Sequence, residues 1–417
     1  MTATVWMEST QGNATLRLGP GVSRWTARAL DHSSVIHAWP EAPAYSTSGE
    51  PLPCACVVAP PGGAEAAAGS VIERLPFPSG GAAALVISLE PGARRPEARA
   101  WLVSEGSCTE ASVQWVDGRE SIQSRNRGLA DPDLLAGRCA AVVGLGSGGS
   151  AVALELARAG VGRFVLIDFD RLEPSNISRH ICGLEALGRL KTLAVRDALL
   201  RRNPWARVET VEMNVNDDPC ALSRALSAAN VVIGATDDRR SRSNINRAAV
   251  DLGVTALFGR VLSRGVGGDV LRVRPGQGPC LSCVFGQGLL SGEEEISQRA
   301  QARRMAPEYV SDSELGARIQ PGLSADIAPV CTMITRLALH ELTRSQHGAV
   351  ESLEDDLAAD LYVWANRREG VYAQLPPMGY RFDRSAILRW YGARVARNPR
   401  CPACGASADT DDAAFFR

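Results

Sequence analysis

The chain has 417 residues, of which 45% are hydrophobic and 22% charged, values that are ordinary for a globular protein of two or three domains. Its net charge of −1 gives no reason to expect nucleic acid or an anionic membrane as a partner. We find no uncharged apolar run of 18 residues and no basic segment followed by an apolar one at the N-terminus, so we expect a cytoplasmic protein without a membrane span.

Residues 1–125 contain short apolar segments, such as CACVVAP and AAALVISLE, separated by breaks rich in proline and glycine. This alternation predicts a small, separate N-terminal domain that is either α/β or mostly β. Its role stays open. A degenerate copy of a catalytic domain, kept for dimerisation or for docking a partner, is one interpretation.

From residue 138 the pattern changes to strands that alternate with helices. RCAAVVGLGSGG is a strand that runs into a glycine turn, SAVALELARAG is a helix, and RFVLIDFD is a second buried strand. Further predicted helices cover 188–203, 221–229 and about 241–252, with strands at 206–215, 230–237 and 255–261 and a hairpin-like segment at 267–276. This order predicts an α/β fold with a doubly wound, Rossmann-like parallel sheet.

The remaining segments complete a second domain over residues 126–417. Residues 284–320 are polar and charge-rich, which predicts a crossover loop. GLSADIAPVCTMITRLALHEL predicts a buried helix. Residues 350–400 are expected to hold two short strands, LYVWAN and VYAQLP, and a final helix.

The glycine turn carries the first chemical signal. Gly144, Gly146 and Gly149 lie between a strand and a helix, where glycines allow the backbone to approach a phosphate at the helix N-terminus. Asp168 ends the next strand, where a carboxylate can meet a ribose hydroxyl. These features predict a nucleotide site without choosing between NAD and ATP, and a purely structural turn is the alternative.

The residues after Asp168 favour ATP. Asp170 is followed by Asn176, Arg179 and Lys191, which suit a triphosphate and its leaving pyrophosphate. A dehydrogenase has no use for them. Asp237 ends another strand at the same edge of the sheet, and a carboxylate there suits Mg²⁺.

Residues 138 to about 345 resemble the E1-like, ThiF/MoeB adenylating family, which activates the C-terminal glycine of ubiquitin-like proteins and sulfur carriers. The motifs that carry the resemblance are GLGSGG, DFDRLEPSNISRH, Lys191, the run TDDRRSRSNIN and CLSC. The resemblance implies that Asp168 binds the ATP ribose, with Asp170 beside it. It also implies that Asn176, Arg179 and Lys191 contact the phosphates and that Asp237 handles Mg²⁺.

Just upstream, the segment SRNR at 124–127 is similar to the family's R-x-x-R segment, whose second arginine reaches the phosphates of the partner subunit. The resemblance therefore assigns Arg127 to catalysis in a partner. A basic interdomain linker is the alternative interpretation.

Four of the eleven cysteines form two Cys-x-x-Cys pairs. In a reducing compartment this pattern indicates a metal or reactive thiols before disulfides, and two such pairs suit a closed tetrahedral zinc site. The long gap between the pairs leaves a redox role open, but the family carries a structural zinc at these relative places. The predicted zinc ligands are Cys280, Cys283, Cys401 and Cys404.

The chain departs from the family pattern at two places. His180 stands where the family has glutamine, a variant that we associate with bacterial E1-like proteins of ubiquitin-like conjugation and antiphage-defence operons. No cysteine lies between Cys283 and Cys331, where thioester-forming members carry one. Either the reaction stops at the acyl-adenylate or another residue accepts the acyl group, the candidates being Ser311, Ser313, Ser324, Cys331 and Cys182.

The resemblance implies an ATP- and Mg²⁺-dependent adenylyltransferase that activates the C-terminal glycine of a ubiquitin-like protein and passes the acyl group to a carrier or an E2-like partner. Adenylation of a sulfur carrier or of a peptide in cofactor or natural-product biosynthesis is the alternative. A nicotinamide dehydrogenase and an inactive scaffold are less well supported. Because one copy of the full ATP motif is visible, we expect a homodimer.

Overall fold

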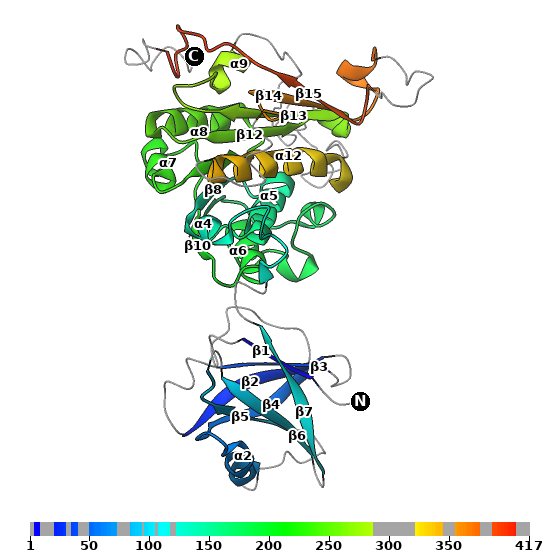
Figure 1. The fold of residues 1–417 in the computed structure, drawn as a ribbon. Helices are drawn as coiled ribbons and strands as arrows, with labels where there is room; N and C mark the ends of the chain where they lie inside the picture. Colours follow the sequence, from blue (N-terminus) through cyan, green and yellow to red (C-terminus); the bar gives the residue numbers. More distant parts are fainter. Residues whose placement is uncertain are drawn as a thin grey trace. The chain divides into compact units, whose positions relative to one another are not determined.

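A computed structural model describes residues 4–8, 21–30, 35–40, 50–72, 84–93, 96–104, 107–116, 122–286, 322–344, 355–375 and 386–405. The chain divides into two compact units, Met1–Arg125 and Asn126–Arg417 (Figure 1). Among the described residues, no helix has the length and apolar character that crossing a membrane requires.

The first unit is a closed barrel with the strand order β1-β3-β2-β4-β5-β6-β7. Side chains alternate between the two faces of a strand, so Leu85, Ile87 and Leu89 of β5 point into the barrel core while Val86 packs against helix α2. The elements are β1 (Thr4–Glu8), β2 (Gly21–Leu30), β3 (Val35–Pro40), β4 (Glu50–Val58), α2 (Ala64–Ile72), β5 (Ala84–Glu90), β6 (Glu97–Ser104) and β7 (Ser107–Val116).

The second unit contains an eight-stranded sheet of order β10-β9-β8-β11-β12-β13-β14-β15. The first five strands are parallel and the last three join them antiparallel, so the predicted doubly wound sheet is confirmed, with an antiparallel extension. The strands are β8 (Cys139–Val143), β9 (Arg163–Ile167), β10 (Arg207–Val211), β11 (Val231–Gly234), β12 (Ala256–Val261), β13 (Gly267–Val273), β14 (Leu361–Ala365) and β15 (Arg389–Ala393).

Helices cover both faces of this sheet. One core cluster joins α4, α5, α6 and α12 to one face, and a second joins α7, α8 and α9 to the other. The helices are α4 (Pro132–Gly137), α5 (Ser147–Ala159), α6 (Lys191–Leu200), α7 (Pro219–Leu226), α8 (Arg239–Leu252), α9 (Leu281–Phe285) and α12 (Ser324–Thr343), with 3₁₀ turns η1 (Pro174–Asn176), η2 (Leu184–Ala186), η3 (Ser263–Gly265) and η5 (Gly370–Tyr372).

The strand register brings three loops to one edge. Val143 of β8 pairs with Ile167 of β9 and with Gly234 of β11, so these strands end level with one another. The strand order reverses between β8 and β11, and ligands of open α/β sheets bind at such a switch point, outside the carboxyl ends of the strands. The glycine turn, Asp168 and the segment that holds Asp237 follow directly.

Two predicted elements near the C-terminus are wrong. Arg389–Ala393 forms strand β15 where we expected a final helix, because pairing with β14 brings Trp390 to 5.3 Å from Trp364 between ring centroids and this contact overrides local helix propensity. VYAQLP is not a strand in its described part. It enters η5 and a turn instead.

Candidate functional site

The glycine turn between β8 and α5 leaves no space for side chains at two positions. A Cβ on Gly144, whose φ is +88°, would lie 2.7 Å from the carbonyl oxygen of Ala235, and a Cβ on Gly149 would lie 1.9 Å from the carbonyl oxygen of Gly144. At Gly146, the first residue before α5, a Cβ would meet nothing within 4 Å, and no side chain caps the helix there. The turn therefore presents an uncapped helix N-terminus, which attracts anions.

Asp168 ties the glycine turn to the end of β9. Its Oδ2 accepts a hydrogen bond of 2.6 Å from the backbone N–H of Leu145, and its Oδ1 accepts one of 2.8 Å from the N–H of Asp170. Hydrogen bonds to an ionised carboxylate are strong, so this side chain fixes the turn. Its half-buried position leaves lone pairs for a ribose hydroxyl.

Asp170 and Lys191 form an ion pair beside the turn, with 2.8 Å between Nζ and Oδ2. Lys191 is the first residue of α6 and its side chain is 10% exposed, whereas that of Asp170 is 49% exposed. The backbone N–H of Lys191 also donates to the carbonyl of Asp170 at 2.9 Å. The ammonium is thus held at the carboxyl edge of the sheet by a partner that faces solvent.

Asp237 adds a second carboxylate near Asp170. Asp237 is exposed, yet desolvation by the neighbouring protein raises the pKa of its carboxyl group above the usual value. The negative charges of Asp238 and Asp170 raise this pKa further, and Arg242 opposes them. The two neighbouring carboxylates repel each other, and oxygen ligands of this kind suit Mg²⁺.

Asn176 and Arg179 lie on the turns that follow Asp170. The side-chain oxygen of Asn176 accepts from the N–H of Glu173 at 3.0 Å, and the backbone N–H of Arg179 donates to the carbonyl of Asn176 at 3.0 Å. The guanidinium of Arg179 passes close to Gly322, where an added Cβ would lie 3.7 Å from Nη1. Arg179 therefore lies beside the segment that leads into α12.

Arg127 belongs to a different part of this unit. The side-chain amide of its neighbour Asn126 donates to the carbonyl of Arg158 at 3.1 Å, in the last turn of α5. A helix of 13 residues is about 20 Å long. Arg127 thus lies at the end of α5 that is opposite to the glycine turn of its own chain.

The candidate acyl acceptors have different surroundings. Burial raises the pKa of Cys331 to about 12 and that of Cys182 to about 11, so both thiols stay protonated near neutral pH. Cys331 lies on α12 with its Sγ 3.7 Å from the carbonyl oxygen of Gly148. Ser324 is exposed at the start of α12, and Ser311 and Ser313 lie outside the described residues.

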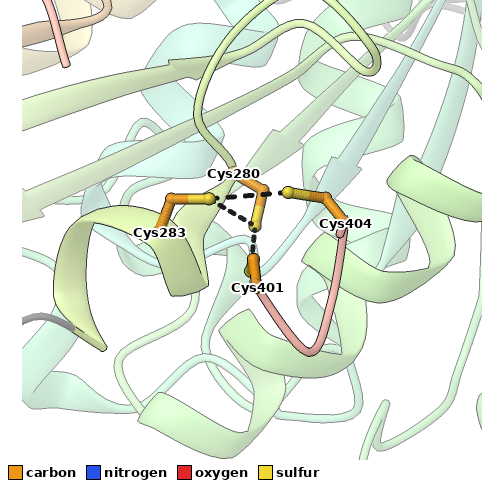
Figure 2. Close-up of side chains that lie close together, drawn as sticks. All are labelled: Cys280, Cys283, Cys401 and Cys404. Carbon is orange, nitrogen blue, oxygen red and sulfur yellow. Dashed lines mark hydrogen bonds between the residues drawn. The ribbon is translucent and has the colours of Figure 1, made fainter. Parts of the chain in front are cut away.

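The four predicted zinc ligands meet in one cluster, with Cys283 on α9, Cys280 just before it, and Cys401 and Cys404 on a C-terminal loop (Figure 2). The Sγ atoms are 3.5 Å apart for Cys280 and Cys401, 3.5 Å for Cys283 and Cys404, and 3.8 Å for Cys280 and Cys283. Four sulfurs at Zn–S bonds of 2.3 Å in a tetrahedron are about 3.8 Å apart. Both the donor set and the spacing fit zinc.

Local hydrogen bonds also suit thiolate ligands. Burial acts to raise the pKa of Cys283, but the backbone N–H of Asn398, which donates to its Sγ at 3.5 Å, and neighbouring groups bring that pKa below its usual value. The side-chain oxygen of Asn246, a fully buried residue of α8, accepts from the N–H of Leu281 at 3.0 Å. The cluster is therefore anchored to the helix that begins beside Asp237.

Two hydrogen bonds near the carboxyl edge of the sheet are not indicated by the sequence pattern, one made by His180 and one by Arg242. His180 departs from the family pattern, and its Nε2 lies 2.9 Å from the carbonyl oxygen of Leu145. Arg242, in the run TDDRRSRSNIN, donates from Nε to the carbonyl of Thr236 at 2.9 Å. In both cases, the only sign in the sequence is a polar residue inside a nucleotide-binding motif.

Each of two curated relatives matches little more than a third of the chain. Ubiquitin-like modifier-activating enzyme 5 of Dictyostelium discoideum is 28% identical over 165 residues, 37% of this chain and 43% of the relative. Molybdopterin-synthase adenylyltransferase of Salmonella typhimurium is 32% identical over 154 residues, 36% of this chain and 61% of the relative. The chain thus matches less than two thirds of each relative's length.

Among solved structures, E. coli MccB with ATP superimposes with a TM-score of 0.46 at 17% identity, covering 66% of this chain and 68% of that one. The model of the ThiF family matches residues 128–366, more than half of the chain and the whole nucleotide motif. The chain therefore belongs to the ThiF family.

Proposed function

We propose that this protein adenylates the C-terminal glycine of a ubiquitin-like protein with ATP and releases pyrophosphate. The observation that carries the proposal is the arrangement at the carboxyl edge of the sheet, where an uncapped helix N-terminus, Lys191 and two carboxylates surround the switch point. Similarity to a ubiquitin-like modifier-activating enzyme and to a molybdopterin-synthase adenylyltransferase supports the same class of reaction.

In the proposed reaction, the N-terminus of α5 and Asp168 hold the nucleotide, while Asn176, Arg179 and Lys191 neutralise its phosphates. The terminal carboxylate of the partner attacks the α-phosphorus, the bond from that phosphorus to the bridging oxygen breaks, and pyrophosphate leaves with the electron pair. A bound Mg²⁺, held by Asp237 together with Asp170, would neutralise phosphate charge. Positioning and charge neutralisation supply the catalysis, so this step needs no protein nucleophile.

The site can be tested by exchange of labelled pyrophosphate into ATP in the presence of a candidate carrier protein. We expect Asp237→Ala to reduce exchange by about a hundredfold or more, because the loss of one charge-stabilising group of this kind typically costs that much. Glu209→Ala, a change on the neighbouring strand β10 away from the carboxyl edge, is the control and keeps wild-type exchange. An Asp237→Ala protein that still exchanged normally would overturn the mechanism.

A homodimer in which Arg127 serves the partner's site is part of the proposal. Its support is the position of Arg127 at the far end of α5 from its own glycine turn. The matching test mixes two inactive variants, Arg127→Ala and Asp237→Ala. If Arg127 acts in the partner, mixed dimers regain one intact site and exchange returns to a quarter of the wild-type rate or less. If the mixture stays inactive, Arg127 does not act across subunits.

The class of partner is proposed on similarity and is tested by substrate choice. In the first case, the partner is a ubiquitin-like protein that ends in glycine, the acyl group passes to an E2-like protein, and the pathway serves defence against phage. A sulfur carrier is favoured instead by the Salmonella relative. Exchange with a panel of purified carriers separates them, and an E2-like or deubiquitinase-like neighbouring gene would agree with the first case.

A further inference from the structure

His180 bridges the glycine turn and the loop that carries Arg179. It lies between η1 and η2, and its backbone N–H donates to the carbonyl of Asn176 at 2.9 Å. Its ring has a contact at each nitrogen. Nε2 is 2.9 Å from the carbonyl oxygen of Leu145, and Nδ1 is 3.1 Å from the backbone nitrogen of Cys182. One half-buried side chain thus contacts two segments of the nucleotide motif.

The two partners assign the protonation state of the ring. A backbone N–H can only donate, so Nδ1 facing Cys182 must be the unprotonated acceptor. A carbonyl oxygen can only accept, so Nε2 facing Leu145 must carry the proton. Both hydrogen bonds exist together only in the neutral ring with its proton on Nε2. The imidazolium form would direct two N–H groups, those of Nδ1 and Cys182, at each other.

Leu145 is held from both sides as a result. Its N–H donates to Asp168 at 2.6 Å and its carbonyl accepts from His180 at 2.9 Å, while its side chain is fully buried. The peptide groups on either side of Leu145 lead into Gly146 and the N-terminus of α5. Their orientation therefore determines where the backbone N–H groups of the turn point.

The surroundings of the ring favour its neutral form. Burial lowers the pKa of His180 below its usual value, and the positive charge of Lys191 on α6 lowers it further, whereas the hydrogen bond to Leu145 and the charge of Asp168, just after β9, act in the opposite direction. The ring therefore stays neutral in the folded protein at pH values where a free histidine, with a pKa of about 6.5, is already gaining a proton.

We propose that neutral His180 is a positioning residue that holds the glycine turn against the Arg179 loop and makes nucleotide binding sensitive to acid. Protonation of Nδ1 removes the acceptor for Cys182 and opens the bridge. Because the folded protein binds this proton less readily than the unfolded chain, the bridge stabilises the fold fully above about pH 6.5. That contribution is lost as the pH falls through the lowered pKa. The inference for nucleotide binding rests on the proposed function.

Glutamine offers a non-titrating replacement. Its amide nitrogen can donate to the carbonyl of Leu145 while its amide oxygen accepts from Cys182. His180→Gln should therefore keep the bridge at every pH, and His180→Ala should lose it at every pH. His340→Gln removes a buried histidine on α12 and is the matched control for the loss of a titratable ring.

The first experiment measures binding of a non-hydrolysable ATP analogue with Mg²⁺ between pH 7.5 and 5.5. The change in affinity of His180→Gln over this pH range measures the effect of protonating the analogue itself and serves as the baseline. Relative to that variant, we expect wild type and His340→Gln to lose about tenfold more affinity, roughly the effect of one or two ordinary hydrogen bonds. His180→Ala should bind about tenfold more weakly at pH 7.5. A pH dependence in His180→Gln equal to that of wild type, or an alanine variant that binds as wild type does, overturns the proposal.

A second experiment needs no nucleotide and separates this proposal from the proposed function. Nitrogen NMR of the histidine rings, assigned by comparison with His180→Gln, should show Nε2 protonated and Nδ1 bare at pH 7.5. It should also show a pKa below that of a free histidine. The opposite tautomer, or a ring that is already charged at pH 7.5, overturns the proposal. If no variant binds the analogue but the tautomer is as expected, the bridge stands and the proposed function fails.

Discussion

The nucleotide region and the four-cysteine cluster lie in the same unit, but the chain builds them in different ways. Asp168, Asp170, Asn176, Arg179 and Lys191 follow one another within 24 residues, and their positions depend on the strand register and on hydrogen bonds between neighbouring loops. The cysteine cluster joins two short segments that are 121 residues apart. Nearby chain segments hold the first region, whereas the second brings distant segments together through one shared centre.

We therefore expect the two regions to respond differently to substitution of their residues. Loss of one contact in the nucleotide region leaves the strands beneath it in place. A zinc ion held by the four cysteines would join α9 to the C-terminal loop, so its loss would release these two segments from each other. Variants that change stability without changing nucleotide binding therefore distinguish the two regions.

The largest effect is expected for Cys401→Ser. Cys401 is fully buried, and its replacement leaves three thiolates, which hold zinc much less tightly. We expect zinc to be lost and the free energy of unfolding to fall by about 4 kcal/mol or more, because metal binding of this kind is coupled to folding. Metal analysis and denaturant unfolding measure both quantities.

Cys220→Ser is the matched control for this change, because Cys220 is exposed and lies outside the cluster. It should keep both the zinc content and the stability of the wild type. If Cys401→Ser also kept its zinc, the cluster would not be a four-thiolate site.

A somewhat smaller effect is expected for Gly149→Ala. The new Cβ would lie 1.9 Å from the carbonyl oxygen of Gly144 and 3.1 Å from the Cβ of Ala235, so the backbone must move. We expect a loss of roughly 3 kcal/mol in the free energy of unfolding, together with loss of nucleotide binding. Gly137→Ala meets nothing within 4 Å and should be near neutral in both measurements. Equal stability of the two variants would show that the turn is more open than its geometry indicates.

The sequence predicts local elements of the fold better than it predicts long-range strand pairing. The glycine turn and the alternating strands and helices are visible because they follow local periodicity and local backbone requirements. The pairing of Trp390 with Trp364 depends on a contact between distant segments, so local propensity predicted a helix where β15 forms. The barrel of the first unit closes through pairing of β1 with β7, which no local pattern in the sequence reveals.

The candidate site shows the same limit at the scale of single atoms. Charge and spacing were enough to select Asp168 and Lys191. They did not reveal that Asp168 also binds the backbone of the turn, or that His180 binds the opposite side of Leu145. These roles depend on which carbonyl or N–H a folded loop presents, and residue type alone does not specify that.

An intermediate effect is expected at Asn246, the residue that connects α8 to the cysteine cluster. Asn246→Ala leaves the buried N–H of Leu281 without its acceptor, which costs about 1–3 kcal/mol. If the two regions are independent, nucleotide affinity stays unchanged while zinc is released more readily to a chelator. A parallel loss of nucleotide affinity would mean that α8 couples the cluster to Asp237 and that the two regions are not independent.

The smallest effect is expected for Cys331→Ala, which tests whether the nucleotide region contains a covalent acceptor. The Cys331 thiol lies 3.7 Å from the carbonyl of Gly148, close to the proposed site, but burial raises its pKa to about 12. At pH 8 only about one molecule in ten thousand then carries the thiolate, which is the nucleophilic form. We therefore expect pyrophosphate exchange within about twofold of wild type and a stability loss near 1 kcal/mol from the small cavity. Ser324→Ala, an exposed change at the start of the same helix, provides the comparison for a hydroxyl acceptor.

Mass spectrometry of the protein with ATP and its carrier should find no adduct on Cys331. An adduct that disappears in Cys331→Ala would mean that binding of the substrate exposes and activates this thiol.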